Sequence, residues 1–172
     1  QAVVPVVRHR MPATVPMEWP FGIEKFVSIY PKSVVVVAGV SNMGKTAVLL
    51  DTVRKNMTRY AIDYYTNEMG GPAIRDRIEN FGLPLDEWNF RVFERADMFQ
   101  DVIDPEHVSI IDYLENVEGE DYKIKGYISK IFQKLTTGVV VIALQKRAGA
   151  SRDFAEGVAA FLEKRRPVFQ GR

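Results

Sequence analysis

The stretch that decides the fold runs from Val34 to Leu50 and reads VVVVAGVSNMGKTAVLL. Its four leading valines predict a β-strand that is buried on both faces of a parallel sheet. The segment 39–46 then fits the pattern G-x-x-x-x-G-K-[ST], and the residues after it have helical spacing. A strand, a glycine-bounded loop and a helix in this order predict a loop that binds a phosphate chain.

Each part of this loop has a chemical reason. Glycines let the backbone turn its N–H groups inward around phosphate oxygens, and the following helix offers its positive end to the anion. We expect Lys45 to reach the β- and γ-phosphates and the Thr46 hydroxyl to ligate Mg²⁺. The alternative is a glycine turn with a purely structural role. The residues predicted to bind the nucleotide are Gly39, Val40, Ser41, Asn42, Met43, Gly44, Lys45, Thr46 and Ala47.

Strands and helices alternate along the rest of the chain. This alternation predicts an α/β fold, a mostly parallel twisted sheet flanked by helices on both faces. The segment 1–20 contains four prolines and is predicted to form an extended arm, with 21–172 as the core. Further strands are predicted at 60–66, 89–94, 107–112, 138–144 and 168–170, and helices at 45–57, 71–82 and 122–135.

Composition excludes several classes of protein. The chain has 172 residues, of which 47% are apolar, so it can bury the core of one domain. It has no cysteine, which excludes disulfides and thiolate metal sites and fits a reducing compartment. No apolar run approaches the ~20 residues of a membrane span, and the amino-terminal residues have the wrong order for a signal peptide. We therefore expect a soluble, cytoplasmic protein with no membrane partner.

The net charge of +1 hides an uneven distribution. Residues 1–60 carry eight Lys/Arg against three Asp/Glu, a net charge of +5. Residues 61–121 carry four against sixteen (−12), and residues 122–172 carry eleven against three (+8). Two interpretations stay open. The faces are simply solvated, or the two ends of the chain form a basic surface that meets a polyanion.

Polar residues close three of the predicted strands, where a hydrolytic site needs them. Asp112 is a candidate to polarise a water in the Mg²⁺ shell, or else caps the next turn. Glu68 is a candidate to orient the attacking water, or else lies beside a helix dipole. Gln145 is a candidate sensor of the γ-phosphate, or else a simple strand-end residue. Asp63, within its strand, suits the water-orienting role less well than Glu68.

The remaining aromatic and histidine residues have ordinary interpretations. The aromatic side chains alternate along the predicted strands, which indicates core packing. His9 and His107 do not form a catalytic or metal-binding set and are interpreted as structural or exposed. The aromatic residues concerned are Tyr60, Tyr64, Tyr65, Phe90 and Phe93.

The order phosphate loop, Glu, Asp, Gln resembles the RecA-fold ATPases, and most closely the motor domain of DnaB-type replicative helicases. AGVSNMGKTAVLL resembles that family's phosphate loop, and YYTNEMGGPAIRDRI its strand, Glu-Met pair and arginine-bearing helix. SIIDYLENV is similar to its Ile-Asp-Tyr-Leu segment, and VVVIALQKRAG to its strand ending in Gln before a basic loop. The resemblance covers residues 21–170, and implies that 21–172 form a RecA-like ATPase core.

The resemblance implies ATP and Mg²⁺ as cofactors, with Glu68 as the catalytic glutamate. It implies a homo-oligomeric ring or filament, commonly a hexamer, with ATP between subunits. It also implies single-stranded DNA contacts from the loops after Asp112 and Gln145. The loop after Asp112 begins with acidic residues, which repel phosphate, so the predicted DNA contacts lie in the loop after Gln145. The alternative is that this second loop is simply solvated. They are Lys146, Arg147 and Arg152.

Two features depart from the family. We expect its amino-terminal primase-interacting domain to be absent and its terminal strands to be shortened, replaced or missing. Those strands carry a Lys-x-Arg pair that reaches the neighbour's ATP. The candidates for this finger are Lys164, Arg165 and Arg166.

Three hypotheses for function follow. The first is a Mg²⁺-dependent, ATP-hydrolysing, helicase-like motor core acting on DNA in replication or recombination. The second is a nucleotide-gated assembly factor, loader or regulatory ATPase without unwinding activity. The third, a small-molecule kinase, is disfavoured because no segment reads as a lid and the candidate site suits water as the acceptor.

Overall fold

The computed structural model describes residues 13–40, 42–67, 69–116, 121–146, 156, 159–160 and 163–170. The strands are β1 (Val34–Val40), β2 (Ile62–Thr66), β3 (Arg91–Glu94), β4 (Val108–Asn116) and β5 (Val139–Lys146). The helices are α1 (Lys45–Asn56), α2 (Gly71–Glu79) and α3 (Asp121–Lys134). Short 3₁₀ turns occur at Pro20–Lys25, Leu85–Glu87 and Phe99–Asp101. Among the described residues, no helix has the length and apolar character that crossing a membrane requires.

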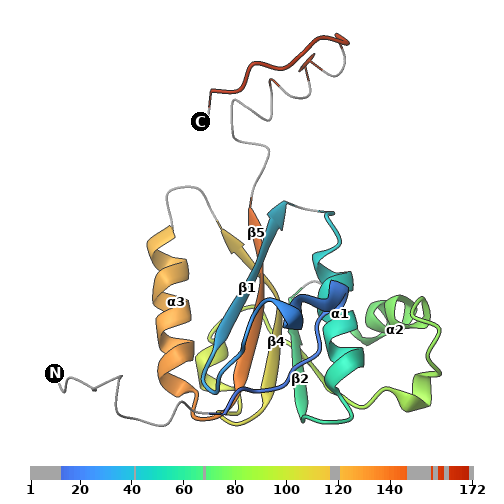
Figure 1. Ribbon diagram of the computed structural model, residues 1–172, viewed down its shortest axis with the longest axis vertical. Coiled ribbons are helices and arrows are strands. Elements are labelled where there is room, and N and C mark those ends of the chain that lie inside the picture. The colour runs from blue at the N-terminus through green and yellow to red at the C-terminus, as the bar shows by residue number, and fades with distance from the viewer. Residues whose placement is uncertain are drawn as a thin grey trace, which may run out of the picture.

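The five strands form one sheet in the order β1-β5-β4-β2-β3. Every neighbouring pair is parallel, so all the carboxyl ends lie at one edge of the sheet (Figure 1). The crossover connections of a parallel sheet bring helices to its faces, so both faces are covered. The predicted α/β fold, a parallel sheet with helices on both faces, is confirmed.

Different helices cover the two faces of the sheet: α1 and α2 lie on one face and α3 on the other (Figure 1). On one face, here called the α1 face, Leu49 and Val53 of α1 pack with Tyr64 and Ile110 of the strands. The opposite face, the α3 face, is covered by α3 and the turn Phe99–Asp101. Successive strand residues point to opposite faces, so each strand contributes to both cores. Ile131 and Leu135 anchor the α3 side.

Local sequence explains where the helices begin and end. α1 begins directly after Gly44, whose φ of 78° lies in the left-handed region that glycine adopts without steric cost. α2 has Pro72 in its first turn, where a missing backbone N–H costs nothing. Gly82, with φ of 68°, follows the end of α2 and lets the chain reverse.

The edges of the sheet differ from the sequence expectation. β1 was expected to be buried on both faces, but within the described residues it pairs with β5 alone and is an edge strand. Val36 is consequently 41% exposed. The predicted strand at 168–170 is wrong: these residues are not paired, and Val168 and Phe169 are 70% and 62% exposed. The reason is visible in Figure 1, where this segment lies beyond the sheet with no strand beside it.

β4 extends further than predicted, to Asn116. Its register on β5 shifts between Ile111 and Leu114, next to a cis peptide bond between Asp112 and Tyr113. The predicted strand ended at Asp112, because the mixed sequence after this residue lost the apolar pattern.

The segment that precedes the sheet packs on α1. Residues 13–19 form neither helix nor strand, and Met17 and Trp19 are buried at 3% and 4% exposure within the core of the α1 face. Asn56 on α1 holds this segment: its Oδ1 accepts from the Glu18 N–H at 3.0 Å, and its Nδ2 donates to the Glu18 carbonyl at 2.7 Å. Residues 1–12 of the predicted arm lie outside the described residues.

Replacing Asn56 with alanine is expected to destabilise the domain by about 1–3 kcal/mol, because backbone groups of Glu18 lose their partners in a half-buried place. The measurement is urea-induced unfolding. Asn80→Ala is the matched control, since Asn80 also donates to the carbonyl four residues earlier but is exposed. It should change stability by less than about 0.5 kcal/mol. Equal effects of the two changes would contradict this role of Asn56.

Candidate active site

The phosphate loop joins the carboxyl end of β1 to the start of α1. Gly44 and Asn42 both have positive φ, of 78° and 60°, which makes the tight turn that the loop needs. Lys45 is only 8% exposed, and its ammonium donates to the Val40 carbonyl at 2.6 Å. The aliphatic stem of Lys45 packs beside Gly39. The loop is thus closed around the lysine side chain that was predicted to bind phosphate.

The first turn of α1 has features that suit an anion. Gly44 occupies the capping position without a side-chain hydrogen bond to the helix, and the first turn carries no acidic residue. The first backbone N–H groups of a helix have no partner within it, and its positive dipole end lies there. Met43 and Ala47 are exposed and Thr46 is half-buried, while Ser41 lies outside the described residues.

The sheet order sets the distance from this loop to Asp112. β5 lies between β1 and β4, and places Gln145 beside Gly39. Asp112 pairs in register with Thr66 on the other side of β4. Two strand spacings, about 10 Å of backbone separation, therefore lie between β1 and β4. That leaves room between the loop and the carboxylate at the carboxyl edge of the sheet.

Asp112 is held in place by a tyrosine. It is 2% exposed, and its Oδ2 accepts a hydrogen bond of 2.6 Å from the Tyr64 hydroxyl. Burial, and then the negative charge of Asp112, raise the pKa of Tyr64 well above its ordinary value. The phenol consequently stays protonated and remains a donor. The bond is made to Oδ2 of the carboxylate.

Sequence reasoning missed this contact because it assigned Tyr64 to core packing. Tyr64 does pack in the core, at 0% exposure. A signal was present in the sequence. Tyr64 lies on a strand that is buried on both faces, and the hydroxyl of a buried tyrosine needs a hydrogen-bond partner. Asp112, at the end of another predicted strand, was the available acceptor.

The other two predicted site residues are placed less completely. Gln145 is half-buried, and its Nε2 lies 3.4 Å from the Tyr113 hydroxyl. Its amide is therefore next to the residue that follows Asp112. Glu68 lies outside the described residues, between Asn67 and Met69. The Met69 N–H donates to the Thr66 hydroxyl at 3.2 Å, which turns the chain at the end of β2.

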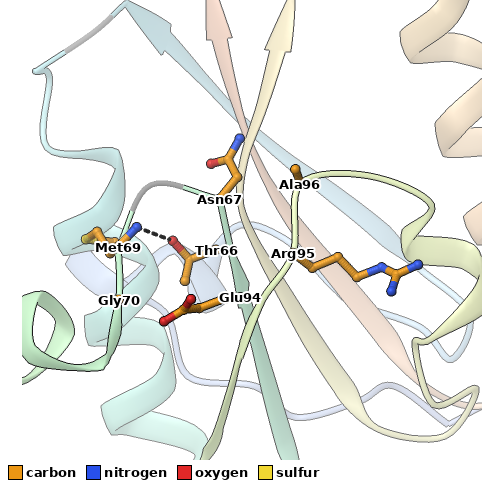
Figure 2. Close-up of a pocket in the computed structure, with 7 residues that line it drawn as sticks. All are labelled: Thr66, Asn67, Met69, Gly70, Glu94, Arg95 and Ala96. Atoms are coloured by element: carbon orange, nitrogen blue, oxygen red, sulfur yellow. Dashed lines mark hydrogen bonds between the residues drawn. The ribbon is translucent and has the colours of Figure 1, made fainter.

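A cavity of about 360 Å³ lies at the carboxyl ends of β2 and β3 (Figure 2). Glu94 presents a carboxylate there, close to Gly70. Arg95 turns its guanidinium away, because its Nε donates to the Asp97 carbonyl at 2.8 Å. The cavity suits a triphosphate poorly, and the loop after β1 is the better anion site. The lining residues are Thr66, Asn67, Met69, Gly70, Glu94, Arg95 and Ala96.

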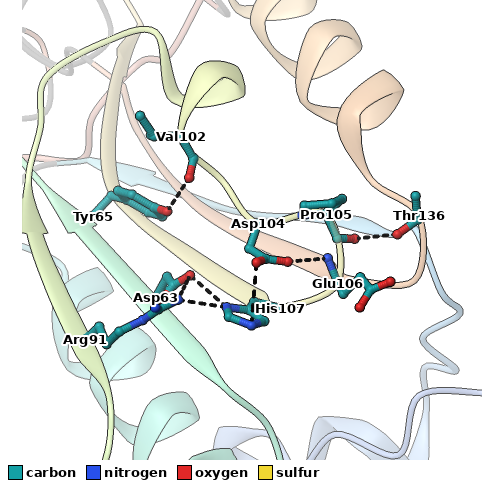
Figure 3. A network of polar contacts seen from close by, with 9 residues as sticks. All are labelled: Asp63, Tyr65, Arg91, Val102, Asp104, Pro105, Glu106, His107 and Thr136. Atoms are coloured by element: carbon teal, nitrogen blue, oxygen red, sulfur yellow. Dashed lines mark hydrogen bonds and ion pairs between the residues drawn. The ribbon is translucent and has the colours of Figure 1, made fainter.

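A second polar cluster occupies the amino ends of the strands (Figure 3). Asp63 is 2% exposed at its side chain and receives two hydrogen bonds from Arg91, of 2.6 and 2.8 Å. His107 lies 3.0 Å from the same carboxylate, with Asp104 beyond it. Asp63 therefore sits at the end of β2 opposite to Thr66. Its position leaves it far from a water-orienting role at the phosphate loop.

The same cluster accounts for His107 as a structural residue. Among the described residues, no three His, Cys, Asp or Glu side chains gather as a metal-binding group. His9 lies outside the described residues. The interpretation of His107 as structural agrees with these contacts.

The basic residues predicted to contact DNA or a neighbour are only partly placed. Lys146 ends β5, whereas Arg147 and Arg152 lie outside the described residues. Arg165 is engaged within its own chain, since its Nη2 donates to Glu156 at 2.9 Å and its Nε to Glu163. Lys164 and Arg166, the other two finger candidates, are exposed.

The contact between Glu156 and Arg165 predicts a titration. Hydrogen bonds from Arg165 and then from the Val168 N–H lower the pKa of Glu156 to about 2. A lowered pKa means that the contact is complete above the ordinary value of 4.5 and is lost as the pH falls through about 2. The Val168 amide chemical shift should report this midpoint. Glu156→Gln should abolish the titration, and a midpoint near 4.5 would contradict the contact.

Comparison with known proteins gives fold-level similarity only. No family model and no curated protein matches the sequence. One similar solved structure is a DnaB-like replicative helicase studied with its interactions with primase, at 16% identity and a TM-score of 0.44 over 73% of this chain. Another is the ATP synthase subunit NeqB from Nanoarcheaum equitans, at 10% identity and a TM-score of 0.45 over 86% of this chain. The chain spans 43% and 48% of those two structures, less than half of each.

Proposed function

We propose that the chain is a RecA-like core that binds ATP with Mg²⁺ and hydrolyses it. The observation that carries the proposal is the pairing of two features at one edge of the sheet. The loop after β1 is closed around the buried Lys45, and the buried Asp112 lies two strands away. A phosphate-binding loop and a separate carboxylate are two of the parts that nucleotide hydrolysis needs from the protein.

The loop would bind the triphosphate through its backbone. The N–H groups of the loop and of the first turn of α1 would donate to phosphate oxygens, supported by the helix dipole. Lys45 would exchange the Val40 carbonyl for the β- and γ-phosphate oxygens, which are stronger acceptors because they are charged. Its buried stem fixes the direction from which the ammonium reaches them.

The residues present fit a magnesium ion. A threonine hydroxyl and an aspartate carboxylate are hard oxygen donors of the kind that Mg²⁺ prefers, and the Asp112 carboxylate is held through Oδ2 by Tyr64. Thr46 would hold the ion directly and Asp112 through a water. When bound, Mg²⁺ neutralises charge that develops on the phosphate oxygens. Asp112 would orient the water by accepting its hydrogen bond.

Two further roles are proposed from the residues at strand ends. Glu68 would accept a proton from the attacking water and hold it in line with the γ-phosphate. Gln145 would contact the γ-phosphate and pass its presence to the loop at 146–157. The position of Gln145 beside Gly39, and its contact with Tyr113, support this coupling role.

The action on DNA and the assembly are also proposals. Lys146, Arg147 and Arg152 would contact the backbone of single-stranded DNA, which needs positive charge and no sequence reading. The chain would form a homo-oligomer, either a ring or a filament, with the bound ATP next to the neighbouring subunit. The motor would act in the cytoplasm. The finger would come from Lys164, Arg165 or Arg166. Since Arg165 is engaged with Glu156, it would have to exchange that partner.

Single-stranded DNA should stimulate the hydrolysis of ATP by the full chain. The measurement compares turnover with and without an oligonucleotide at two salt concentrations, on protein whose mass in solution is known. Phosphate contacts predict a stimulation that weakens as salt rises. Arg147→Ala should reduce the stimulation and leave the basal rate unchanged. A rate that DNA does not alter at either salt concentration would exclude the motor function.

One sequence observation favours the second function, nucleotide-gated assembly without unwinding. The sequence 115–121 carries Glu115, Glu118, Glu120 and Asp121, which repel a nucleic-acid backbone. Light scattering with and without an ATP analogue separates the two functions. Assembly that requires nucleotide but is accompanied by no salt-sensitive DNA binding would select the assembly role.

A further inference from the structure

We infer that Tyr64 is a positioning residue for Asp112, and that its hydroxyl sets the orientation in which this carboxylate meets the metal-bound water. The inference rests on the proposed Mg²⁺-ATP site and assigns a role to a side chain of β2. Tyr64 touches neither nucleotide nor metal in this account. It acts through one hydrogen bond to Asp112.

The contact is well defined in the structure. The hydroxyl-to-Oδ2 distance is 2.6 Å, between two side chains that are both almost fully buried. Tyr64 lies on β2 and Asp112 on the neighbouring β4, where Tyr64 pairs with Ile110 and Thr66 with Asp112. Tyr64 thus lies two residues before the level of Asp112, and its long side chain reaches forward to the carboxylate.

The tyrosine ring is fixed from several sides. Phe90 meets it edge to face, with 6.0 Å between the ring centres and 71° between the planes. The same ring belongs to the packed core of the α1 face, with Ile110 and Val53. A buried ring in such packing occupies one rotamer, so its hydroxyl has a fixed position. The hydroxyl therefore determines the rotation of the carboxylate.

Energetics make the hydrogen bond necessary for a charged Asp112. A buried carboxylate is costly unless donors satisfy it. A hydroxyl-to-carboxylate bond of 2.5–2.7 Å is among the stronger hydrogen bonds in proteins, and the Tyr64 distance falls in that range. Without the hydroxyl, the carboxylate loses its orientation and a stabilising donor together.

The expected consequence is specific to the metal. Residues that orient a metal-site carboxylate from outside typically cost 10- to 100-fold in metal affinity when removed. Asp112 would act through a water, so we expect the lower end of this range. Tyr64→Phe should raise the Mg²⁺ concentration for half-maximal effect about tenfold. Saturating Mg²⁺ should restore most of the function.

The experiment uses the full chain and a matched control. Tyr65, the next residue, is also buried, and its hydroxyl donates to the Val102 carbonyl at 3.2 Å on the α3 face. Tyr65→Phe removes a phenol hydroxyl from the same strand but not from the site. Two readouts are taken at increasing Mg²⁺, the binding of a non-hydrolysable fluorescent ATP analogue and the hydrolysis of ATP. Thermal unfolding without metal reports on stability.

The outcomes separate a positioning role from a structural one. Positioning predicts a Mg²⁺ midpoint shifted about tenfold in Tyr64→Phe and by less than about twofold in Tyr65→Phe. Equal shifts in both variants, or a lowered unfolding temperature with an unchanged Mg²⁺ midpoint, would overturn the inference. In an Asp112→Asn background, adding Tyr64→Phe should shift the Mg²⁺ midpoint no further, because Tyr64 acts only through the Asp112 carboxylate. An additive shift would also overturn it.

The binding readout distinguishes this inference from the proposed function. If the wild-type protein binds the analogue in a Mg²⁺-dependent way but releases no phosphate, the hydrolysis proposal fails while the shifted midpoint still supports Tyr64. If analogue binding by the wild type does not depend on Mg²⁺, the role of Tyr64 is refuted together with the metal site.

Discussion

Replacing Lys45 with alanine is expected to reduce the turnover of ATP by at least about 100-fold, since the ammonium is the cation that the loop directs at the developing charge. Lys45 is buried, and its ammonium already lies within the loop. The measurement is steady-state phosphate release at saturating Mg²⁺. The loss should appear in both turnover and nucleotide affinity, because the lysine contacts phosphate before and during transfer.

Lys55→Ala is the control for this change, because Lys55 lies in the last turn of the same helix, away from the loop. It should leave turnover within about twofold, as surface changes usually do. A Lys45→Ala protein that hydrolyses ATP at the wild-type rate, while folded by circular dichroism, would refute the assignment of the loop.

Replacing Asp112 with asparagine is expected to have a comparable effect on hydrolysis, about 100-fold, with little change of shape. The amide oxygen can still accept from Tyr64, so the core should stay intact. What is lost is the negative charge that orients the metal-bound water. The residual activity should also require much more Mg²⁺ than the wild type does.

Asp63→Asn is the matched control for Asp112→Asn, since both aspartates are buried on adjacent strands but at opposite ends. Asp63 pairs with Arg91, so its replacement should lower the unfolding midpoint in urea and preserve the rate of hydrolysis of the folded protein. Asp112→Asn should leave the unfolding midpoint in urea nearly unchanged and reduce the rate of hydrolysis. If Asp63→Asn abolished hydrolysis and Asp112→Asn did not, the site would lie at the wrong end of the sheet.

Local patterns in the sequence predicted the elements of the fold well. The valines of β1, the glycines of the loop and the spacing of α1 are local signals, and the structure has each of them close to its predicted bounds. The neighbours of each strand are not a local property. Four valines indicate a buried strand equally well at the centre or the edge of a sheet, so the exposure of Val36 was not predictable.

The candidate site shows the same limit. Lys45 was identified from the loop pattern, and Asp112 from its place at a strand end. Their separation depends on the insertion of β5 between β1 and β4, a matter of sheet order. The bond between Tyr64 and Asp112 spans 48 positions and depends on that order as well. It explains why a tyrosine that packs in the core also belongs to the site.

The most direct test of the central claim is the release of phosphate from ATP by the purified full chain, measured with Mg²⁺ and with excess EDTA, beside Lys45→Ala. The account predicts multiple turnovers with Mg²⁺, none with EDTA, and none above background in the variant. Phosphate release by the wild type that is equal with Mg²⁺ and with EDTA, or equal to that of Lys45→Ala, would contradict it.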